Sequence, residues 1–175
     1  MRSYFWKYFT IFLILALLQI LFFNNLILRI GHWFFVPEVY ILLFLLLPYD
    51  TKNFSLLTTG FVVGLIIDLI DGSLALHTAS SVMAIFLRPL ILTMVSPQLG
   101  YTQGIPLSYQ NYGWIWFIKY STVFVFIHHL TYYLLNNFNL AHLPVILLQS
   151  VINTIYTMIF IVITHYFIKN RPLNA

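Results

Sequence analysis

Long apolar stretches separated by short polar breaks make up almost the whole chain. A helix needs about 20 apolar residues to cross roughly 30 Å of hydrocarbon, so uncharged stretches predict membrane spans. Six spans are expected, over residues 8–28, 33–49, 53–70, 76–95, 114–135 and 143–168. The stretch 33–49 would cover only about 25 Å as a helix, which leaves open whether it crosses completely. Residues 96–113, which are rich in Gly, Pro, Gln and Tyr, predict a loop whose role is open.

The composition supports a single integral membrane domain over residues 1–175. Only 7% of the residues are charged, 61% are apolar and the mean hydropathy is +0.92, whereas soluble domains carry about 25% charged residues. This composition excludes a soluble or nucleic-acid-binding domain, and the net charge of +4 is interpreted as loop charge. The chain has no cysteine, which excludes disulfides and thiolate chemistry.

The basic residues predict the orientation of the spans. Cytoplasmic segments of membrane proteins carry an excess of Lys and Arg. With the N-terminus in the cytoplasm, one residue, Arg29, lies outside and the others lie in or near cytoplasmic segments: Arg2, Lys7, Lys52, Arg88, Lys119, Lys169 and Arg171. This bias requires an even number of spans and places both termini in the cytoplasm. No cleavage site follows the first apolar stretch, so we expect a retained anchor rather than a signal peptide.

A stripe of small residues and one acid follows the predicted span 53–70. Gly60, Gly64, Asp68 and Gly72 recur every four residues, so they share one face of a helix. Glycines on such a face let another helix backbone approach closely, which is how helices associate in lipid. We expect the stripe to be a contact for helices, either within the chain or from a partner protein.

Most of the acids are expected at the outer face of the membrane, where Glu38, Asp68 and Asp71 come together with His77. His77 is the expected neighbour of Asp68 or Asp71. For Asp68, a helix-terminal charge in water and a buried polar contact are both open, whereas Asp71 is expected to be a solvated loop charge. Arg88 lies roughly 13 Å deeper than Asp68, too far for a hydrogen bond. It is therefore expected to reach the cytoplasm or to fix its own end of the helix.

The remaining polar residues give no sign of catalysis, and no catalytic residue, cofactor or metal site is expected. His128 and His129 are adjacent, so on a helix they point about 100° apart and are not expected to share one metal ion. No Gly-x-Ser-x-Gly turn or phosphate-binding glycine loop is present. The acids do not continue across the membrane, which argues against a proton relay. The sequence predicts a protein that is not an enzyme.

At these residues the chain resembles the bacterial rod shape-determining protein MreD family. The family pattern is a Pro-acid pair before an apolar span, a Gly-Phe-x-x-Gly-Leu-x-x-Asp run, a turn with glycine, a Leu-His-Thr/Ala run and a Leu-Arg pair. The matching residues here are Pro37-Glu38, Gly60-Phe61, Gly64-Leu65, Asp68, Gly72, Leu76-His77-Thr78-Ala79 and Leu87-Arg88-Pro89. Ala75 stands where the family often has a second glycine, and the loop 98–113 is longer than is usual in the family.

The resemblance implies a non-enzymatic, multi-pass scaffold in the bacterial cytoplasmic (inner) membrane. Such a scaffold acts in cell shape and lateral peptidoglycan synthesis: it binds MreC and links MreB filaments to the synthases RodA and a class B penicillin-binding protein. A homodimer is compatible with this role. The family is similar in fold to the substrate-binding subunits of energy-coupling-factor transporters, so an all-α bundle of six membrane helices is implied.

Two other classes of function are left open by the sequence. One is a substrate-binding membrane subunit of an energy-coupling-factor-type transporter, with a pocket that opens outwards. Such subunits typically carry an Ala-x-x-x-Ala stripe on the first helix, whereas the first span here contains only Ala16. The other is a lipid-handling enzyme or flippase, which would need a charged cavity near the middle of the membrane.

Overall fold

The computed structural model describes residues 2–167, without the side chains of residues 2–9, 12 and 140. Over these residues the chain is mostly helical and has one two-stranded antiparallel hairpin. The elements are α1 (Arg2–Leu21), η1 (Phe23–Asn25), β1 (Leu28–Ile30), β2 (Trp33–Phe35), η2 (Val39–Ile41), α2 (Leu42–Leu46), α3 (Asn53–Asp71), α4 (Leu76–Met94), α5 (Tyr109–Tyr112), α6 (Trp114–Asn137), η3 (Leu140–His142) and α7 (Leu143–Phe167).

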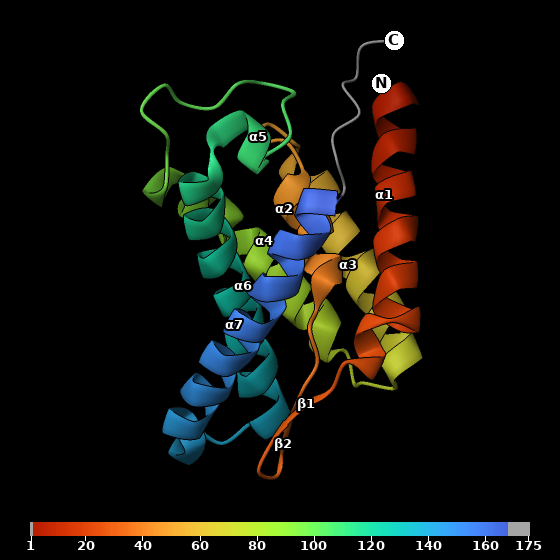
Figure 1. Ribbon diagram of the computed structural model, residues 1–175, viewed down its shortest axis with the longest axis vertical. Helices are drawn as coiled ribbons and strands as arrows, with labels where there is room; N and C mark the ends of the chain where they lie inside the picture. The colour runs from red at the N-terminus through yellow and green to blue at the C-terminus, as the bar shows by residue number, and fades with distance from the viewer. Residues whose placement is uncertain (1, 168–175) are drawn as a thin grey trace.

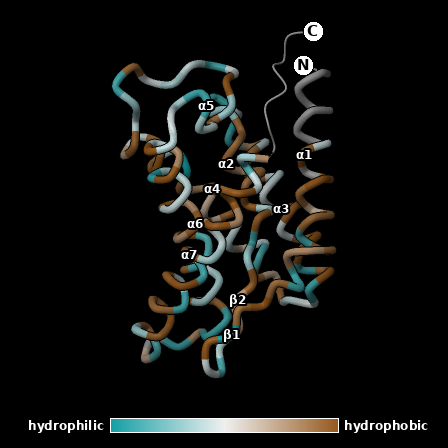
Figure 2. The backbone as a smooth tube through the Cα atoms, in the orientation of Figure 1, coloured by the Kyte–Doolittle hydropathy of each residue, from teal (hydrophilic) through white to brown (hydrophobic). Residues whose placement is uncertain are grey.

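The long helices run between two ends of a bundle (Figure 1). At the hairpin end lie the β1–β2 hairpin, the α3–α4 turn and the α6–α7 turn, which together comprise residues 28–35, 72–75 and 138–142. At the loop end lie α2, the loop 95–113 with α5, and the first turn of α1. Hydrophobic positions dominate the helices, and hydrophilic stretches concentrate around α5 and near the α6–α7 turn (Figure 2).

Within the described residues, three helices are long and apolar enough to cross a membrane, namely α3, α4 and α7. Large apolar side chains stay exposed on the outer surface of the bundle, such as Leu148 and Ile155 on α7. A soluble protein rarely exposes large contiguous apolar surface, so these helix faces are suited to contact with lipid. The predicted ranges 53–70, 76–95, 114–135 and 143–168 match α3, α4, α6 and α7 closely.

The predictions for the first two spans need correction. The helix expected over 8–28 ends at Leu21, and the stretch 33–49 is not one helix. It consists of β2, the single turn η2 and the five-residue helix α2. Pro37 explains part of the break, because proline lacks an N–H and disfavours helical backbone at the preceding residue. Every residue from Val39 to Leu47 is buried.

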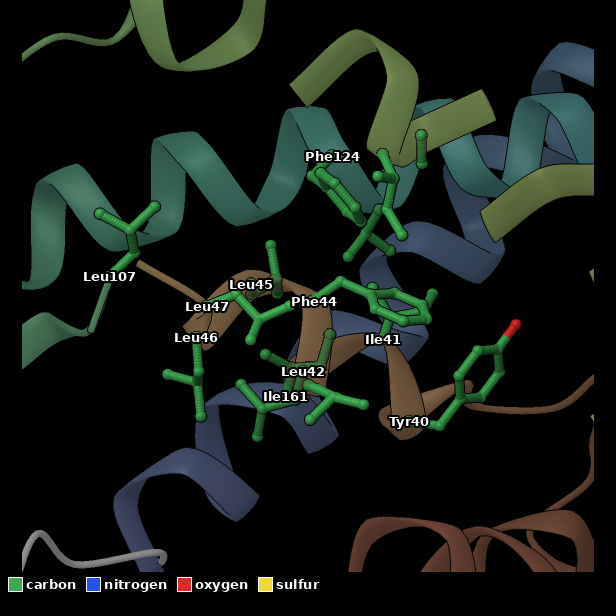
Figure 3. Packing of buried hydrophobic residues seen from close by; sticks show 14 of the residues in the cluster. Tyr40, Ile41, Leu42, Phe44, Leu45, Leu46, Leu47, Leu107, Phe124 and Ile161 are labelled. Atoms are coloured by element: carbon green, nitrogen blue, oxygen red, sulfur yellow. The ribbon is translucent and has the colours of Figure 1, made fainter. Parts of the chain in front are cut away.

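This central segment, residues 36–48, is enclosed by the long helices rather than by lipid. Figure 3 shows its apolar side chains packed among Phe124 of α6 and Ile161 of α7. Irregular backbone is tolerated at membrane depth only where protein or a water-filled cavity surrounds it. Apart from Glu38, the segment carries no charged side chain, and the run from Val39 to Leu47 is apolar on all sides, which suits such a fully buried position.

The glycine stripe packs α3 against α4 of the same chain. A Cβ atom added to Gly64 would lie 2.5 Å from Thr78 Cα and 2.9 Å from the His77 carbonyl oxygen. At Gly60 the nearest atom is Ile85 Cδ1. The stripe is therefore occupied within the chain, so a partner helix would have to bind elsewhere. Gly72 does not pack against a neighbour; it ends α3 with a left-handed backbone (φ +67°).

Candidate functional site

Ionisable side chains from four parts of the chain meet inside the hairpin end. We name these residues the acid–histidine cluster: Glu38, Asp68, His77, His128 and His129. Glu38 precedes η2, Asp68 lies on α3, His77 on α4, and the two adjacent histidines on α6. All five are buried. Buried ionisable groups are rare unless they are paired, so this cluster is the strongest candidate for a functional site.

Asp68 caps the N-terminus of α4 across the α3–α4 turn. Its Oδ1 accepts the backbone N–H of His77 at 2.9 Å, and its Oδ2 accepts the backbone N–H of Thr78 at 2.8 Å. The hydroxyls of Ser73 and Thr78 donate to the same carboxylate. The first turn of a helix leaves N–H groups unpaired, and Ala75, which precedes α4, provides no side-chain cap. Asp68 is 3% exposed, so the alternative of a charge in water is wrong.

His77 links the two buried acids. Its Nδ1 lies 3.0 Å from Asp68 Oδ1, and its Nε2 lies 3.6 Å from Glu38 Oε1. The prediction that His77 is the neighbour of Asp68 is confirmed. Asp71 lies at the surface, where it accepts a hydrogen bond from Asn24 at 2.7 Å. An imidazole between two carboxylates can donate a proton to each, so His77 joins α3 and α4 to the central segment.

Gln19 of α1 holds the central segment at the level of Glu38. Its Nε2 donates to the Pro37 carbonyl at 3.0 Å, and its Oε1 accepts the N–H of Val39 at 2.8 Å. These bonds satisfy backbone groups that η2 leaves unpaired. One signal of this role is present in the sequence, because Gln19 is a lone polar residue within the apolar run 11–23.

His128 and His129 both direct Nδ1 towards Glu38. Glu38 Oε2 lies 3.1 Å from His128 Nδ1 and 3.7 Å from His129 Nδ1. The two rings therefore face one carboxylate although the residues are adjacent on a helix, whereas the expectation that they do not share one metal ion stays a prediction. Two rings that leave a helix about 100° apart can still turn their Nδ1 edges to a group between them, because Nδ1 lies next to Cγ. Here Glu38 occupies that position.

A cavity of about 500 Å³ adjoins the cluster at the hairpin end. Its lining combines residues of the hairpin with polar residues of the long helices, and includes Gln19, His32, Trp33, Glu38, Asp71, His77, Tyr132, Asn136 and Asn153. A concave site with a few convergent polar groups is the usual form of a ligand site. The sequence did not reveal this cavity, because it forms only where the central segment departs from helix.

Arg88 belongs to a separate contact towards the loop end. Its side chain is buried and donates from Nε to the Tyr120 hydroxyl at 2.9 Å. Its guanidinium also donates to the carbonyls of Leu47 and Pro48. Arg88 therefore satisfies carbonyl groups at the end of α2, which a short helix leaves free. Both expected alternatives, reaching the cytoplasm and fixing its own end of the helix, are wrong, because Arg88 is buried and its partners lie outside α4. The prediction that it does not pair with Asp68 agrees with these contacts.

Replacement of Arg88 by lysine should lower the free energy of unfolding by about 1–3 kcal/mol, because a lysine lacks the planar fork that reaches both carbonyls and the hydroxyl. Tyr120→Phe removes only one of these bonds and should cost about 0.5–1.5 kcal/mol. Thermal unfolding of the purified variants in detergent measures both effects. Equal stability of Arg88→Lys and the unaltered chain would show that the buried guanidinium does not hold α2.

No protein-family model, curated protein or solved structure matches this chain. The fold and the site define a class only: a helical protein whose residues 2–167 include three helices long and apolar enough to cross a membrane, with a buried acid–histidine cluster beside a cavity.

Proposed function

We propose that this chain is a non-enzymatic membrane scaffold of the bacterial cell-elongation machinery, similar to MreD. One observation carries the proposal. The residues of the resemblance lie on different segments, yet Glu38, Asp68 and His77 meet in one buried cluster. Gly64 lies against the same turn of α4. Residues that matched the family pattern by chance would not be expected to contact one another in the fold. Their meeting in one cluster therefore supports a structural motif shared with the MreD family.

The proposed topology has six crossings. Five are the long helices α1, α3, α4, α6 and α7, and the sixth is the central segment, which runs from the hairpin end to the loop end (Figure 1). Lys52 and Lys119 lie towards the loop end, and Arg29 lies in the hairpin. By the positive-inside rule, the loop end and both termini would lie in the cytoplasm. The cavity would face the outside of the bacterial inner membrane, as in the substrate-binding subunits of energy-coupling-factor transporters.

The proposed partners follow from the resemblance. The chain would bind MreC and link MreB filaments to RodA and a class B penicillin-binding protein, alone or as a homodimer. Because α4 covers the glycine stripe, the partner surface would lie on the exposed apolar helix faces or on the hairpin. Phe34 of β2 is 59% exposed, which makes the hairpin an accessible contact.

Co-purification from native membranes tests the proposed role. The full-length chain, tagged and extracted in mild detergent, should retain MreC, and a tagged multi-pass protein of similar size should not. Phe34→Ala would keep the fold and reduce the retained MreC if the hairpin is the contact. A well-folded chain that retains no MreC under conditions that preserve other membrane complexes would contradict the scaffold role.

A second candidate is the substrate-binding subunit of an energy-coupling-factor-type transporter. The observation that favours it is the cavity of about 500 Å³, which is large enough for a small molecule and is lined by polar groups. Native mass spectrometry of the purified chain distinguishes the two candidates. A stoichiometric small molecule that is released on denaturation would support uptake, and a chain without such a molecule that retains MreC would support the scaffold.

A further inference from the structure

The acid–histidine cluster contains three polar atoms without a hydrogen-bond partner. They are Glu38 Oε2, His128 Nδ1 and His129 Nδ1. Both histidines are completely buried and Glu38 is 5% exposed. Glu38 Oε2 lies within ion-pair distance of both rings, yet none of the three atoms makes a hydrogen bond, and such buried atoms are uncommon in folded proteins. Three of them at one place call for a common explanation.

The three atoms converge on one point. Glu38 Oε2 lies 3.1 Å from His128 Nδ1 and 3.7 Å from His129 Nδ1, and all three atoms lie within 4.8 Å of one another. Zinc binds nitrogen and carboxylate oxygen at about 2.0–2.2 Å in tetrahedral geometry, which separates two ligand atoms by roughly 3.3–3.6 Å. The two distances to Glu38 bracket this separation.

The second ring nitrogen of each histidine, Nε2, has a hydrogen-bond partner of the kind found in metal-binding histidines. His128 Nε2 lies 2.9 Å from the Tyr40 hydroxyl, and His129 Nε2 lies 3.1 Å from the Thr157 hydroxyl. A metal-bound histidine usually donates its second ring N–H to an oxygen, which fixes the tautomer. If each Nε2 donates in this way, each Nδ1 carries a free lone pair that is directed towards Glu38.

We propose that Glu38, His128 and His129 form a binding site for a divalent transition-metal ion, with zinc as the favoured ion. Two imidazoles and one carboxylate suit zinc, whereas calcium and magnesium prefer oxygen ligands alone. The ion would connect the central segment to α6 at a point where the central segment has no regular helix. The site does not depend on the proposed scaffold role, because its ligands are residues of this chain.

Metal titration of the full-length chain in detergent tests the site. After removal of metal with a chelator, Co²⁺ should bind at one site per chain and give the visible absorption of a low-coordinate site, and Zn²⁺ should displace it. Zn²⁺ should also raise the unfolding temperature, because a ligand that binds only the folded state stabilises it. X-ray absorption of the zinc-loaded chain should show imidazole ligands. No uptake of Co²⁺ by the unaltered chain would overturn the proposal without any variant, and so would a shell of oxygen ligands alone.

Matched substitutions locate the ion. His129→Asn and Glu38→Gln each remove one proposed ligand and should weaken binding at least tenfold. His165→Asn is the control, because His165 is also buried and also has an unpartnered Nδ1, but it belongs to no acid–histidine group. This control should bind Co²⁺ like the unaltered chain. Unchanged binding in both ligand variants, or equal loss in the control, would overturn the assignment.

Discussion

Replacement of Asp68 by alanine is expected to lower the free energy of unfolding by about 3–5 kcal/mol, the cost of removing one partner from a buried ionic contact. The carboxylate accepts the N–H groups that begin α4 and the hydroxyls of Ser73 and Thr78, and it contacts His77. Alanine would leave the backbone N–H groups of His77 and Thr78 and the Thr78 hydroxyl buried without this acceptor. Thermal or denaturant unfolding of the purified variant in detergent measures the loss.

Two matched variants show whether the burial of Asp68 causes the effect. Asp68→Asn keeps one acceptor oxygen and should give an intermediate loss. Asp71→Ala removes the neighbouring acid, which lies at the surface with one hydrogen bond from Asn24, and should cost about 0.5–1.5 kcal/mol. Equal losses for Asp68→Ala and Asp71→Ala would contradict the capping role of Asp68.

Replacement of Gly64 by alanine is expected to cost about 1–3 kcal/mol or more, because overpacking forces the backbone to move. The added Cβ would lie 2.5 Å from Thr78 Cα and 2.8 Å from Thr78 N, and neither atom can move without displacing α4. The same displacement would pull His77 and Thr78 away from Asp68. The measurement is the unfolding temperature, together with the rate of proteolysis at the α3–α4 turn.

Gly60→Ala is the control for this prediction, since it adds the same methyl group one turn earlier on the same helix. Its Cβ would meet Ile85 Cδ1, the far end of a flexible side chain that can adopt another rotamer. Its cost should be less than about 1 kcal/mol. A larger loss at Gly60 than at Gly64 would show that close backbone contact is not what the stripe provides.

The sequence predicted the long regular helices well, because uncharged length and flanking polar residues determine them locally. It failed over 33–49, where composition indicates burial but does not distinguish lipid from protein as the surroundings. Pro37 and Glu38 together were a signal of irregular backbone, and the uninterrupted apolar run from Val39 to Leu47 was compatible with both environments.

Only part of the site was accessible from the sequence. The contact between Asp68 and His77 spans one tight turn, so helix periodicity was sufficient to predict it. The approach of Glu38 to His128 and His129 joins segments about 90 residues apart and depends on where an irregular segment lies inside the bundle. Helix periodicity predicts the directions in which the side chains of one helix point. It does not predict where a side chain of another segment, such as Glu38, lies relative to that helix.

The buried cluster has a consequence for a scaffold. It ties α3, α4, α6 and the central segment together at the hairpin end, and Arg88 ties α2 to α4 and α6 nearer the loop end. The contacts of Asp68 and Arg88 are satisfied hydrogen bonds, and satisfied polar contacts rigidify a helical bundle. A rigid bundle presents a fixed outer surface, and fixed surfaces lose less conformational entropy on binding a partner.

Depletion of the protein in its native cell tests the central claim most directly. The proposed scaffold predicts that rod-shaped cells become round as the protein is depleted, and that expression of the unaltered chain restores rods while Asp68→Ala does not. Cells that keep their rod shape after depletion and instead require an added nutrient would contradict the scaffold role and favour a transport subunit.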